Sequence, residues 1–166
     1  MKTKDIVFAG LFVTLISVCA QIRISTPIVP FTLQPLAIFI TSLTLTKRQA
    51  MLAIVSYVLA GLIGLPVFAG ASGGLYILMK PTFGFIVGFI PMTFLCNRFR
   101  SKPFLACVLS IAILYLVAMP YLFFNLTIIQ SMQISVSSLL INYCFLFLPT
   151  DIISFLLASI ISKRIS

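Results

Sequence analysis

The sequence contains no histidine and no tryptophan, and its only acidic residues are Asp5 and Asp151. Without histidine, the chain has no imidazole to act as a general base, a proton shuttle or a metal ligand. It also has no Walker motif, so it cannot hydrolyse ATP by itself. These absences argue against an intramembrane hydrolase and exclude a histidine-bound metal ion.

Charged residues are scarce as well. They make up 8% of the chain, whereas 61% of the residues are hydrophobic and the mean hydropathy is +1.25. This composition is typical of an integral membrane protein rather than of a soluble domain. A spanning helix needs about 20 residues, so the chain has room for several spans and none for a separate soluble domain. We therefore predict an all-α integral membrane fold in which residues 1–166 form one domain.

The cysteines lie in or beside apolar runs, at Cys19, Cys96, Cys107 and Cys144. None of them forms a CxxC pair. We expect small buried hydrophobic side chains rather than disulfides or metal ligands.

Apolar runs predict six membrane spans, which cover about Ile6–Ile22, Leu36–Leu45, Ala50–Phe68, Thr82–Cys96, Pro103–Phe124 and Val136–Ile161. The second run is short, and Pro149 and Asp151 interrupt the last one. The first run continues to about Ile22 and further runs follow it, so we expect a span there rather than a cleaved signal peptide.

The basic residues predict how these spans are oriented. If both termini are cytoplasmic, the cytoplasmic side holds Lys2, Lys4, Lys47, Arg48, Arg98, Arg100, Lys102, Lys163 and Arg164, and the outer side holds Arg23 and Lys80. Lysine and arginine collect in cytoplasmic loops, so this division predicts both termini inside. The net charge of +9 then reflects topology, and we expect no nucleic-acid partner.

Two loops rich in proline or glycine lie on the predicted outer side, at 23–35 and 64–84. Irregular backbone survives near a membrane only where protein covers it or where it lines a wet cavity. These loops also contain Gln34, Ser72 and Tyr76, so we predict an outward-facing ligand pocket. Two alternatives stay open: the glycines serve only close helix packing, and the two outer cations only extend to the membrane surface.

Asp151 stands in the otherwise uncharged stretch "FLFLPTDIISFLLAS". Proline is favoured in the first turn of a helix, so we expect the last helix to begin at Pro149 and to hold Asp151 at its positive end. The alternative is one long helix kinked at Pro149, which places the carboxylate deeper. Two roles are open for Asp151: it caps its own helix, or it contacts a ligand. An acidic residue within an apolar span favours the ligand contact. A carboxylate accepts hydrogen bonds, so its partner should offer N–H groups.

Three stretches together resemble a known family: "VPFTLQPLA", "GLIGLPVFAGASGGLYILMKPTFGFIVGF" and "FLPTDII". In order and spacing they are similar to the BioY family, the biotin-binding S components of energy-coupling-factor transporters. The resemblance implies a six-helix fold in a bacterial cytoplasmic membrane, with biotin as transported substrate and no cofactor. It places Asp151 against the ureido N–H groups of biotin. The implied binding residues are Asp151, Lys80, Arg23, Gln34, Gly70, Ser72, Gly73, Gly74 and Tyr76.

The chain departs from the family pattern in ways that matter for this site. The family usually has a lysine about one turn after the aspartate, where this chain has Ser154 and Phe155. We therefore expect Lys80, or else Arg23, to neutralise the biotin carboxylate. The AxxxA pattern of the first helix is also absent, and Gly10 with Thr14 is its nearest equivalent.

The resemblance also implies partners. Energy should come from a module of two ATPase subunits and one transmembrane coupling subunit. Three alternatives remain open at this point. The protein could be an S component for another vitamin, a solitary carrier that needs no module, or a membrane scaffold without a small-molecule ligand.

Overall fold

The computed structural model describes residues 3–24 and 28–165, except for the side chains of residues 142, 144 and 165. Lys2, residues 25–27 of the predicted outer loop at 23–35, and the side chain of Cys144 lie outside this description. Helices dominate the described chain. The α-helices are α1 (Thr3–Gln21), α2 (Gln34–Thr44), α3 (Lys47–Leu62), α4 (Phe83–Arg98), α5 (Pro103–Phe124), α6 (Val136–Leu139) and α7 (Leu146–Ile165).

Shorter elements complete the chain. They are the strands β1 (Arg23–Ile24) and β2 (Phe31–Thr32), the 3₁₀-helix η1 (Leu75–Met79), and the π-helical segments η2 (Asn125–Ile129) and η3 (Leu140–Phe145). The strands pair antiparallel, with Arg23 opposite Thr32 and Ile24 opposite Phe31. This small ladder was not predicted, because the prolines of the loop indicated irregular backbone throughout.

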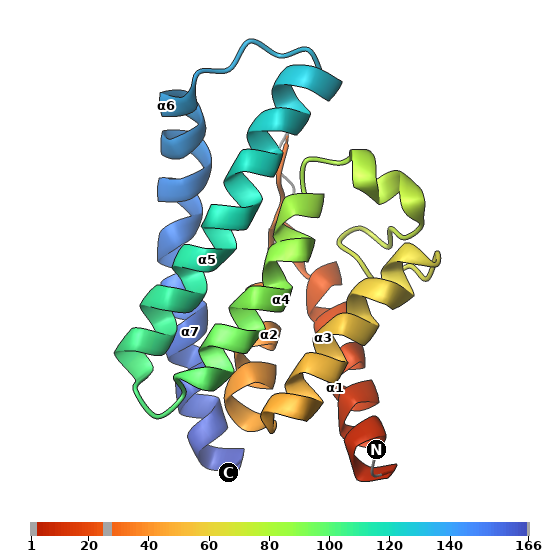
Figure 1. Ribbon diagram of the computed structural model, residues 1–166, viewed down its shortest axis with the longest axis vertical. Coiled ribbons are helices and arrows are strands. Elements are labelled where there is room, and N and C mark those ends of the chain that lie inside the picture. The colour runs from red at the N-terminus through yellow and green to blue at the C-terminus, as the bar shows by residue number, and fades with distance from the viewer. Residues whose placement is uncertain (1–2, 25–27, 166) are drawn as a thin grey trace.

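The helices form a bundle with two distinct ends (Figure 1). The end that carries both termini also carries the α2–α3 and α4–α5 turns, and we call it the terminal end. The opposite end carries the α3–α4 connection and the loop between η2 and α6. By length and composition, the helical stretches Thr3–Gln21, Pro103–Ile129 and Leu146–Arg164 can each cross a membrane. The helices α2, α3 and α4 are shorter, so the six predicted spans remain a prediction.

Helix α3 ends six residues before the predicted end of the third span at Phe68. Gly64 has a φ of +110°, which glycine adopts without steric cost. Its N–H donates to the carbonyl of Gly61 (3.2 Å), and the N–H of Leu65 donates to that of Ala60 (3.1 Å). These two bonds are those of a Schellman motif. The prediction was wrong here because hydropathy continues past a glycine at which the backbone stops being helical.

The last helix corrects a second prediction. Pro149 does not begin a helix but lies inside α7, and helix continues upstream through η3 to Val136. Proline cannot donate to the carbonyl four residues before it, which is that of Phe145. The π-helical segment η3 ends at Phe145, so the altered hydrogen-bonding pattern stands immediately before the proline site. The alternative of one long helix that runs through Pro149 is therefore right.

The bundle is held together by close helix packing and by one polar cap. A Cβ atom on Gly88 of α4 would lie 2.9 Å from the Leu114 side chain and 3.2 Å from the Leu114 carbonyl oxygen of α5, so the missing side chain lets the two helices pack closely. At the terminal end, Asn97 Nδ2 donates to the carbonyls of Ser42 (2.7 Å) and Leu45 (2.9 Å). It thereby satisfies carbonyl groups at the end of α2 that lack a partner within the helix.

The cysteines are reduced in the described part of the chain. Cys96 is fully buried, as predicted, whereas Cys19 and Cys107 are half-buried. The described residues contain no group of three or more potential metal-binding side chains.

Candidate substrate-binding site

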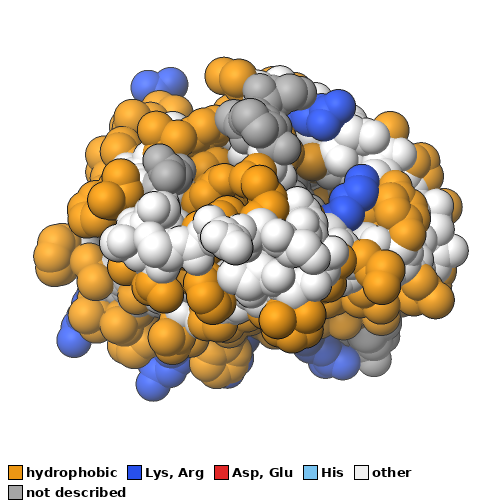
Figure 2. All heavy atoms as spheres, turned by 90° about the horizontal axis from the view of Figure 1, so that it is seen from above, with side chains coloured by type: hydrophobic (Ala, Val, Ile, Leu, Met, Phe, Trp, Pro, Cys, Tyr) orange, Lys and Arg blue, Asp and Glu red, His pale blue; other side chains and the backbone are white. Residues whose placement is uncertain are grey.

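A cavity of about 400 Å³ lies at the end of the bundle opposite the termini. Small-molecule sites usually have volumes of about 300–1,000 Å³. The lining residues come from both loops and from the adjoining helices: Arg23, Ile28, Val29, Pro30, Phe31, Thr32, Gln34, Pro35, Phe68, Ala69, Ser72, Ile77, Lys80, Pro81, Thr82, Phe85, Ile86, Phe89, Leu114, Gln130, Phe147, Thr150, Asp151 and Ser154. We call this cavity the upper pocket. Seen from this end, the surface shows basic side chains among apolar and uncharged ones, with no acidic side chain in view (Figure 2).

Aromatic rings form one wall of the upper pocket. Phe31 and Phe147 stack with their centroids 4.0 Å apart and their planes at 15°. Phe85 follows, 6.3 Å from Phe147, and meets Tyr115 edge to face at 6.4 Å. These rings come from β2, α7, α4 and α5, so the wall ties four elements together. A flat apolar wall of this kind suits a ring or an alkyl chain.

Asp151 lies at the side of the upper pocket and is 5% exposed. It is the sixth residue of α7, so it does not occupy a first helical turn and does not cap the helix. The prediction that the positive end of a helix dipole stabilises this carboxylate is therefore wrong. Instead, the hydroxyl group of Tyr115 on α5 donates a hydrogen bond of 2.6 Å to Asp151 Oδ2. A carboxylate can accept about four hydrogen bonds, so it keeps acceptor capacity for a ligand.

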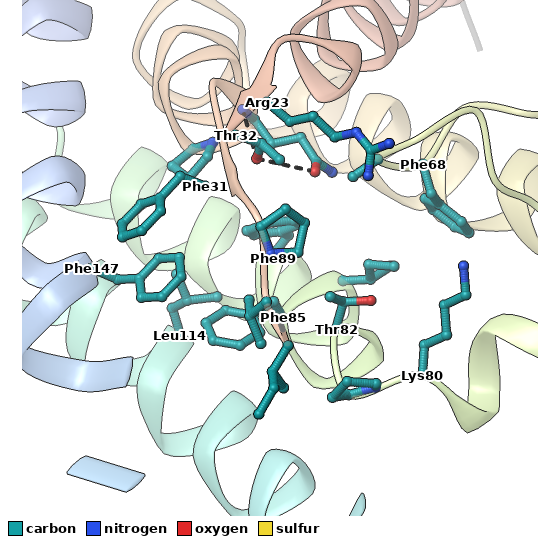
Figure 3. A pocket seen from close by; sticks show the side chains of 18 of the residues that line it. Arg23, Phe31, Thr32, Phe68, Lys80, Thr82, Phe85, Phe89, Leu114 and Phe147 are labelled. Carbon is teal, nitrogen blue, oxygen red and sulfur yellow. Dashed lines mark hydrogen bonds between the residues drawn. The ribbon is translucent and has the colours of Figure 1, made fainter. Parts of the chain in front are cut away.

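Two cations stand on the side of the pocket opposite the aromatic wall. Arg23 and Lys80 approach from either side of Phe68, whereas Phe31, Phe85 and Phe147 lie across the cavity (Figure 3). The Lys80 ammonium lies 4.8 Å from the centroid of the Tyr76 ring, a distance typical of a cation–π contact. Gly70 makes room for Arg23, because a Cβ atom there would lie 2.9 Å from its guanidinium carbon.

Gln34 and Ser72 also line the upper pocket, and both are already hydrogen-bonded. Gln34 Nε2 donates to the Tyr57 hydroxyl at 2.6 Å, and that hydroxyl donates to the carbonyl of Val67 at 3.3 Å. The Ser72 hydroxyl donates to the carbonyl of Ala69 at 2.9 Å. Both side chains therefore hold loop backbone in place as well as facing the cavity.

One further side chain clamps the loop over the pocket. The amide of Gln21 accepts a hydrogen bond from the N–H of Ala71 (2.8 Å) and donates one to the carbonyl of Phe68 (3.1 Å). Between these two residues the backbone turns through positive φ at Gly70 (+77°) and Ala71 (+51°). Phe68 and Ser72 close the turn as an isolated β-bridge. The end of α1 is thus joined to the loop at residues 68–72.

The structure brings five of the nine predicted site residues to the upper pocket: Arg23, Gln34, Ser72, Lys80 and Asp151. The other four, Gly70, Gly73, Gly74 and Tyr76, do not line it. Gly73 packs against backbone, since a Cβ atom there would lie 2.1 Å from the Leu65 carbonyl oxygen. Gly74 has a φ of +98° and shapes the loop before η1.

Several lining residues were missed from the sequence. Phe31, Phe85 and Phe147 all fall within the three family-like stretches, so the signal for them was present in the motifs. Ser154 was noted only as the replacement for a lysine, yet it lines the pocket one turn after Asp151. Tyr115 had no sequence signal, because a single tyrosine in an apolar helix does not reveal which residue of another helix it faces.

An apolar helical bundle with a ligand-sized pocket, one buried carboxylate and two cations has the features of a membrane protein with a small-molecule site. The chain belongs to the BioY family, whose sequence model matches residues 1–166.

Relatives agree with this assignment. The chain is 37% identical over 123 residues to a protein of Pyrococcus horikoshii named "Probable biotin transporter BioY", covering 74% of this chain and 76% of that protein. It is 33% identical over 160 residues to a Lysinibacillus sphaericus protein of the same name, covering 86% and 81%. In fold, it is similar to the crystal structure of an S component for biotin from an ECF-type ABC transporter. That match has a TM-score of 0.72 at 24% identity and covers 99% of this chain and 93% of the other.

Proposed function

We propose that the protein takes up biotin across the membrane as the S component of an energy-coupling-factor transporter. The observation that carries the proposal is the upper pocket, which brings Asp151, Arg23 and Lys80 together at one end of an apolar bundle. Membership of the BioY family, and relatives named as biotin transporters, support biotin as the ligand. Uptake by this route forms and breaks no covalent bond in the substrate, so the protein acts as a carrier and not as an enzyme.

The chemistry of biotin matches the distribution of groups in the pocket. Its ureido ring offers N–H donors, and the remaining lone pairs of the Asp151 carboxylate would accept them. Its tail ends in a carboxylate, which Lys80 and Arg23 would neutralise from the opposite side. Its thioether ring and alkyl chain are apolar and would lie against Phe31, Phe85 and Phe147. Ser154, which stands where the family usually has lysine, cannot supply a charge.

In this proposal six helical segments cross the membrane: α1 to α5, and α6 with α7 as one. Both termini are cytoplasmic, and the upper pocket faces outward from a bacterial cytoplasmic membrane. The arrangement of the bundle supports this orientation, because both termini and the α2–α3 and α4–α5 turns share the terminal end (Figure 1). The described cations at that end are Lys4, Lys47, Arg48, Arg98, Arg100, Lys102, Lys163 and Arg164.

A partner must supply the energy. We assign it to a module of two ATPase subunits and one transmembrane coupling subunit. The first helix offers a contact surface, because a Cβ atom on Gly10 would have nothing within 4 Å, and Thr14 beside it is exposed. Gly10→Leu should therefore leave biotin binding unchanged and reduce module-dependent uptake. Uptake equal to that of the unmodified protein would rule out this surface.

Calorimetry on the purified protein in detergent tests the ligand directly. Micromolar biotin should bind saturably to one site, whereas thiamine and riboflavin, as controls, should not. A folded preparation that binds no biotin would overturn the proposal. Tight binding of one of the control vitamins would instead indicate an S component for a different substrate.

A further inference from the structure

A second cavity, of about 410 Å³, lies toward the terminal end of the bundle, and none of its lining residues lines the upper pocket. We call it the basal groove. It is lined by the end of α2, the α4–α5 turn, the start of α5 and the last turns of α7, through Leu43, Arg100, Ser101, Pro103, Phe155, Ser159, Ser162 and Lys163. The proposed uptake of biotin makes no use of this groove.

The lining of the basal groove is basic and rich in hydroxyl groups. Its charged members are Arg100 and Lys163, and three serines accompany them. The chain's two aspartates lie elsewhere: Asp151 is in the upper pocket, and Asp5 accepts a hydrogen bond from Gln49 at 3.0 Å. Among the described residues, no carboxylate lines the groove to offset its two positive charges. A basic cavity without an internal counter-charge favours an anionic ligand.

Arg100 lines the groove and is exposed, and one of its guanidinium nitrogens is hydrogen-bonded to the end of α2. Its Nη1 donates to the carbonyl of Leu45 at 3.3 Å, beside the two bonds by which Asn97 caps the end of α2. A guanidinium has five N–H donors in a rigid fork, so this one bond leaves most of them available. That geometry suits the oxygens of a phosphate group.

The start of α5 adds to this potential. Pro103, its first residue, lines the groove, and no side chain caps the N-terminus of this 22-residue helix. The first N–H groups of a helix and its dipole both favour an anion at that position. The start of α5 therefore adds positive potential to that of Arg100 and Lys163 in the same cavity.

Exposed apolar side chains continue from the groove toward the middle of the bundle. On α7, Leu156 and Ile160 are 54% and 55% exposed and share a helix face with Lys163. On α5, Phe104 follows Pro103 and is 81% exposed. A cationic end with apolar side chains beyond it matches a phospholipid, whose phosphate occupies the groove while its acyl chains lie along the helices.

We propose that the basal groove binds the headgroup of an anionic phospholipid such as phosphatidylglycerol. Basic pockets between helices at a cytoplasmic surface commonly hold such headgroups, and each cation near that surface contributes about 1 kcal/mol. This inference rests on the proposed orientation, in which the terminal end is cytoplasmic, and it stands whether or not biotin is the transported substrate.

The test compares two double variants of the full chain that lose the same charge. Arg100→Gln with Lys163→Gln removes the cations of the groove. Arg98→Gln with Lys102→Gln removes cations of the same end that do not line it. Binding of fluorescent phosphatidylglycerol to purified protein in detergent should fall about tenfold more in the first variant than in the second. At about 1 M NaCl the Debye length is about 3 Å, so diffuse attraction to the surface is screened, whereas direct contacts within the groove are screened much less. The difference between the two variants should therefore persist at high salt.

Several outcomes would overturn the proposal. Equal losses in both variants would mean diffuse attraction, and no loss would mean no site. Displacement of the lipid by inorganic phosphate as readily as by short-chain phosphatidylglycerol would assign the groove to a free anion. Intact lipid binding together with lost assembly with an ATP-driven module would make it a protein-docking surface.

A second pair of variants covers the case in which loss of Arg100 disturbs folding through its bond to Leu45. Lys163→Gln is compared with Arg164→Gln, its sequence neighbour, which does not line the groove. Lys163→Gln should weaken lipid binding. Lys163→Arg, which keeps the positive charge, should bind lipid as the unmodified protein does, and Arg164→Gln should change lipid binding little. Melting curves in lipid-free detergent check that each variant is folded.

Discussion

The hydroxyl of Tyr115 on α5 donates a hydrogen bond of 2.6 Å to Oδ2 of Asp151 on α7, and both side chains are buried. This bond joins two helices beside the upper pocket and provides a donor to a carboxylate in an apolar bundle. A hydrogen bond to a charged group contributes about 1.5–3 kcal/mol to stability. It therefore gives Asp151 a fixed orientation before any ligand arrives.

Tyr115→Phe removes this donor while keeping the ring against Phe85. We expect the ligand-free protein to lose about 1.5–3 kcal/mol of stability. Biotin should recover part of this loss, because its N–H groups supply donors to the same carboxylate. Thermal melting with and without biotin measures both effects. Tyr143→Phe is the control, since the Tyr143 hydroxyl has no hydrogen bond to another described residue. If the loss of stability in Tyr115→Phe is the same with and without biotin, Asp151 does not contact the ligand.

Asp151→Asn keeps the shape of the side chain and replaces part of its acceptor set with a donor. If the carboxylate accepts hydrogen bonds from ligand N–H groups in this desolvated pocket, the free energy of biotin binding should become less favourable by roughly 2–5 kcal/mol. Calorimetry gives the number. Thr150→Val changes the neighbouring pocket residue without touching the carboxylate and is the matched control. Normal biotin binding by Asp151→Asn would leave the aspartate with a purely structural role.

Lys80→Gln should weaken biotin about tenfold while changing the affinity for an uncharged biotin amide little, because only the acid needs a counter-charge. The comparison of the two ligands in one variant separates charge from shape. Tyr76→Leu, which removes the ring beneath the ammonium, should produce a smaller change in the same direction. If Lys80→Gln loses the same affinity for biotin and for the amide, Lys80 does not neutralise the biotin carboxylate, and Arg23 becomes the candidate.

Single cysteines in a cysteine-free background test the orientation of the bundle. Gln133 and Ser101 are both exposed and lie at opposite ends. In sealed cells, a membrane-impermeant thiol reagent should label Gln133→Cys and not Ser101→Cys. The reverse pattern would invert the proposed topology, and labelling of both would contradict a sealed membrane bundle.

Hydropathy predicted the start of α5 correctly at Pro103, because a proline that follows a basic turn and opens an apolar run favours the first helical position. The helical stretch continues past the predicted end at Phe124, through η2 to Ile129. Hydropathy failed at α3, where Gly64 ends the helix inside a run that stays apolar. Composition records whether a residue prefers lipid to water, and it does not record where the backbone leaves the helical region.

The site divides in a similar way. The sequence motifs located the two loops and Asp151, because those stretches combine glycine, proline and charge within apolar surroundings. They did not locate Tyr115, whose role depends on how α5 and α7 are rotated against each other. Pro149 was misread for a related reason: local propensity favours a helix start there, and the packed bundle continues the helix through it.

The clamp between Gln21 and the loop at 68–72 has a kinetic consequence. One amide group makes both hydrogen bonds, so they break together when the loop moves away from α1. The Ala71 amide proton, although its residue is exposed, should therefore resist exchange with deuterated solvent while the loop is seated. Its exchange rate would therefore report how often the loop at 68–72 separates from α1, in the unmodified protein and without a label.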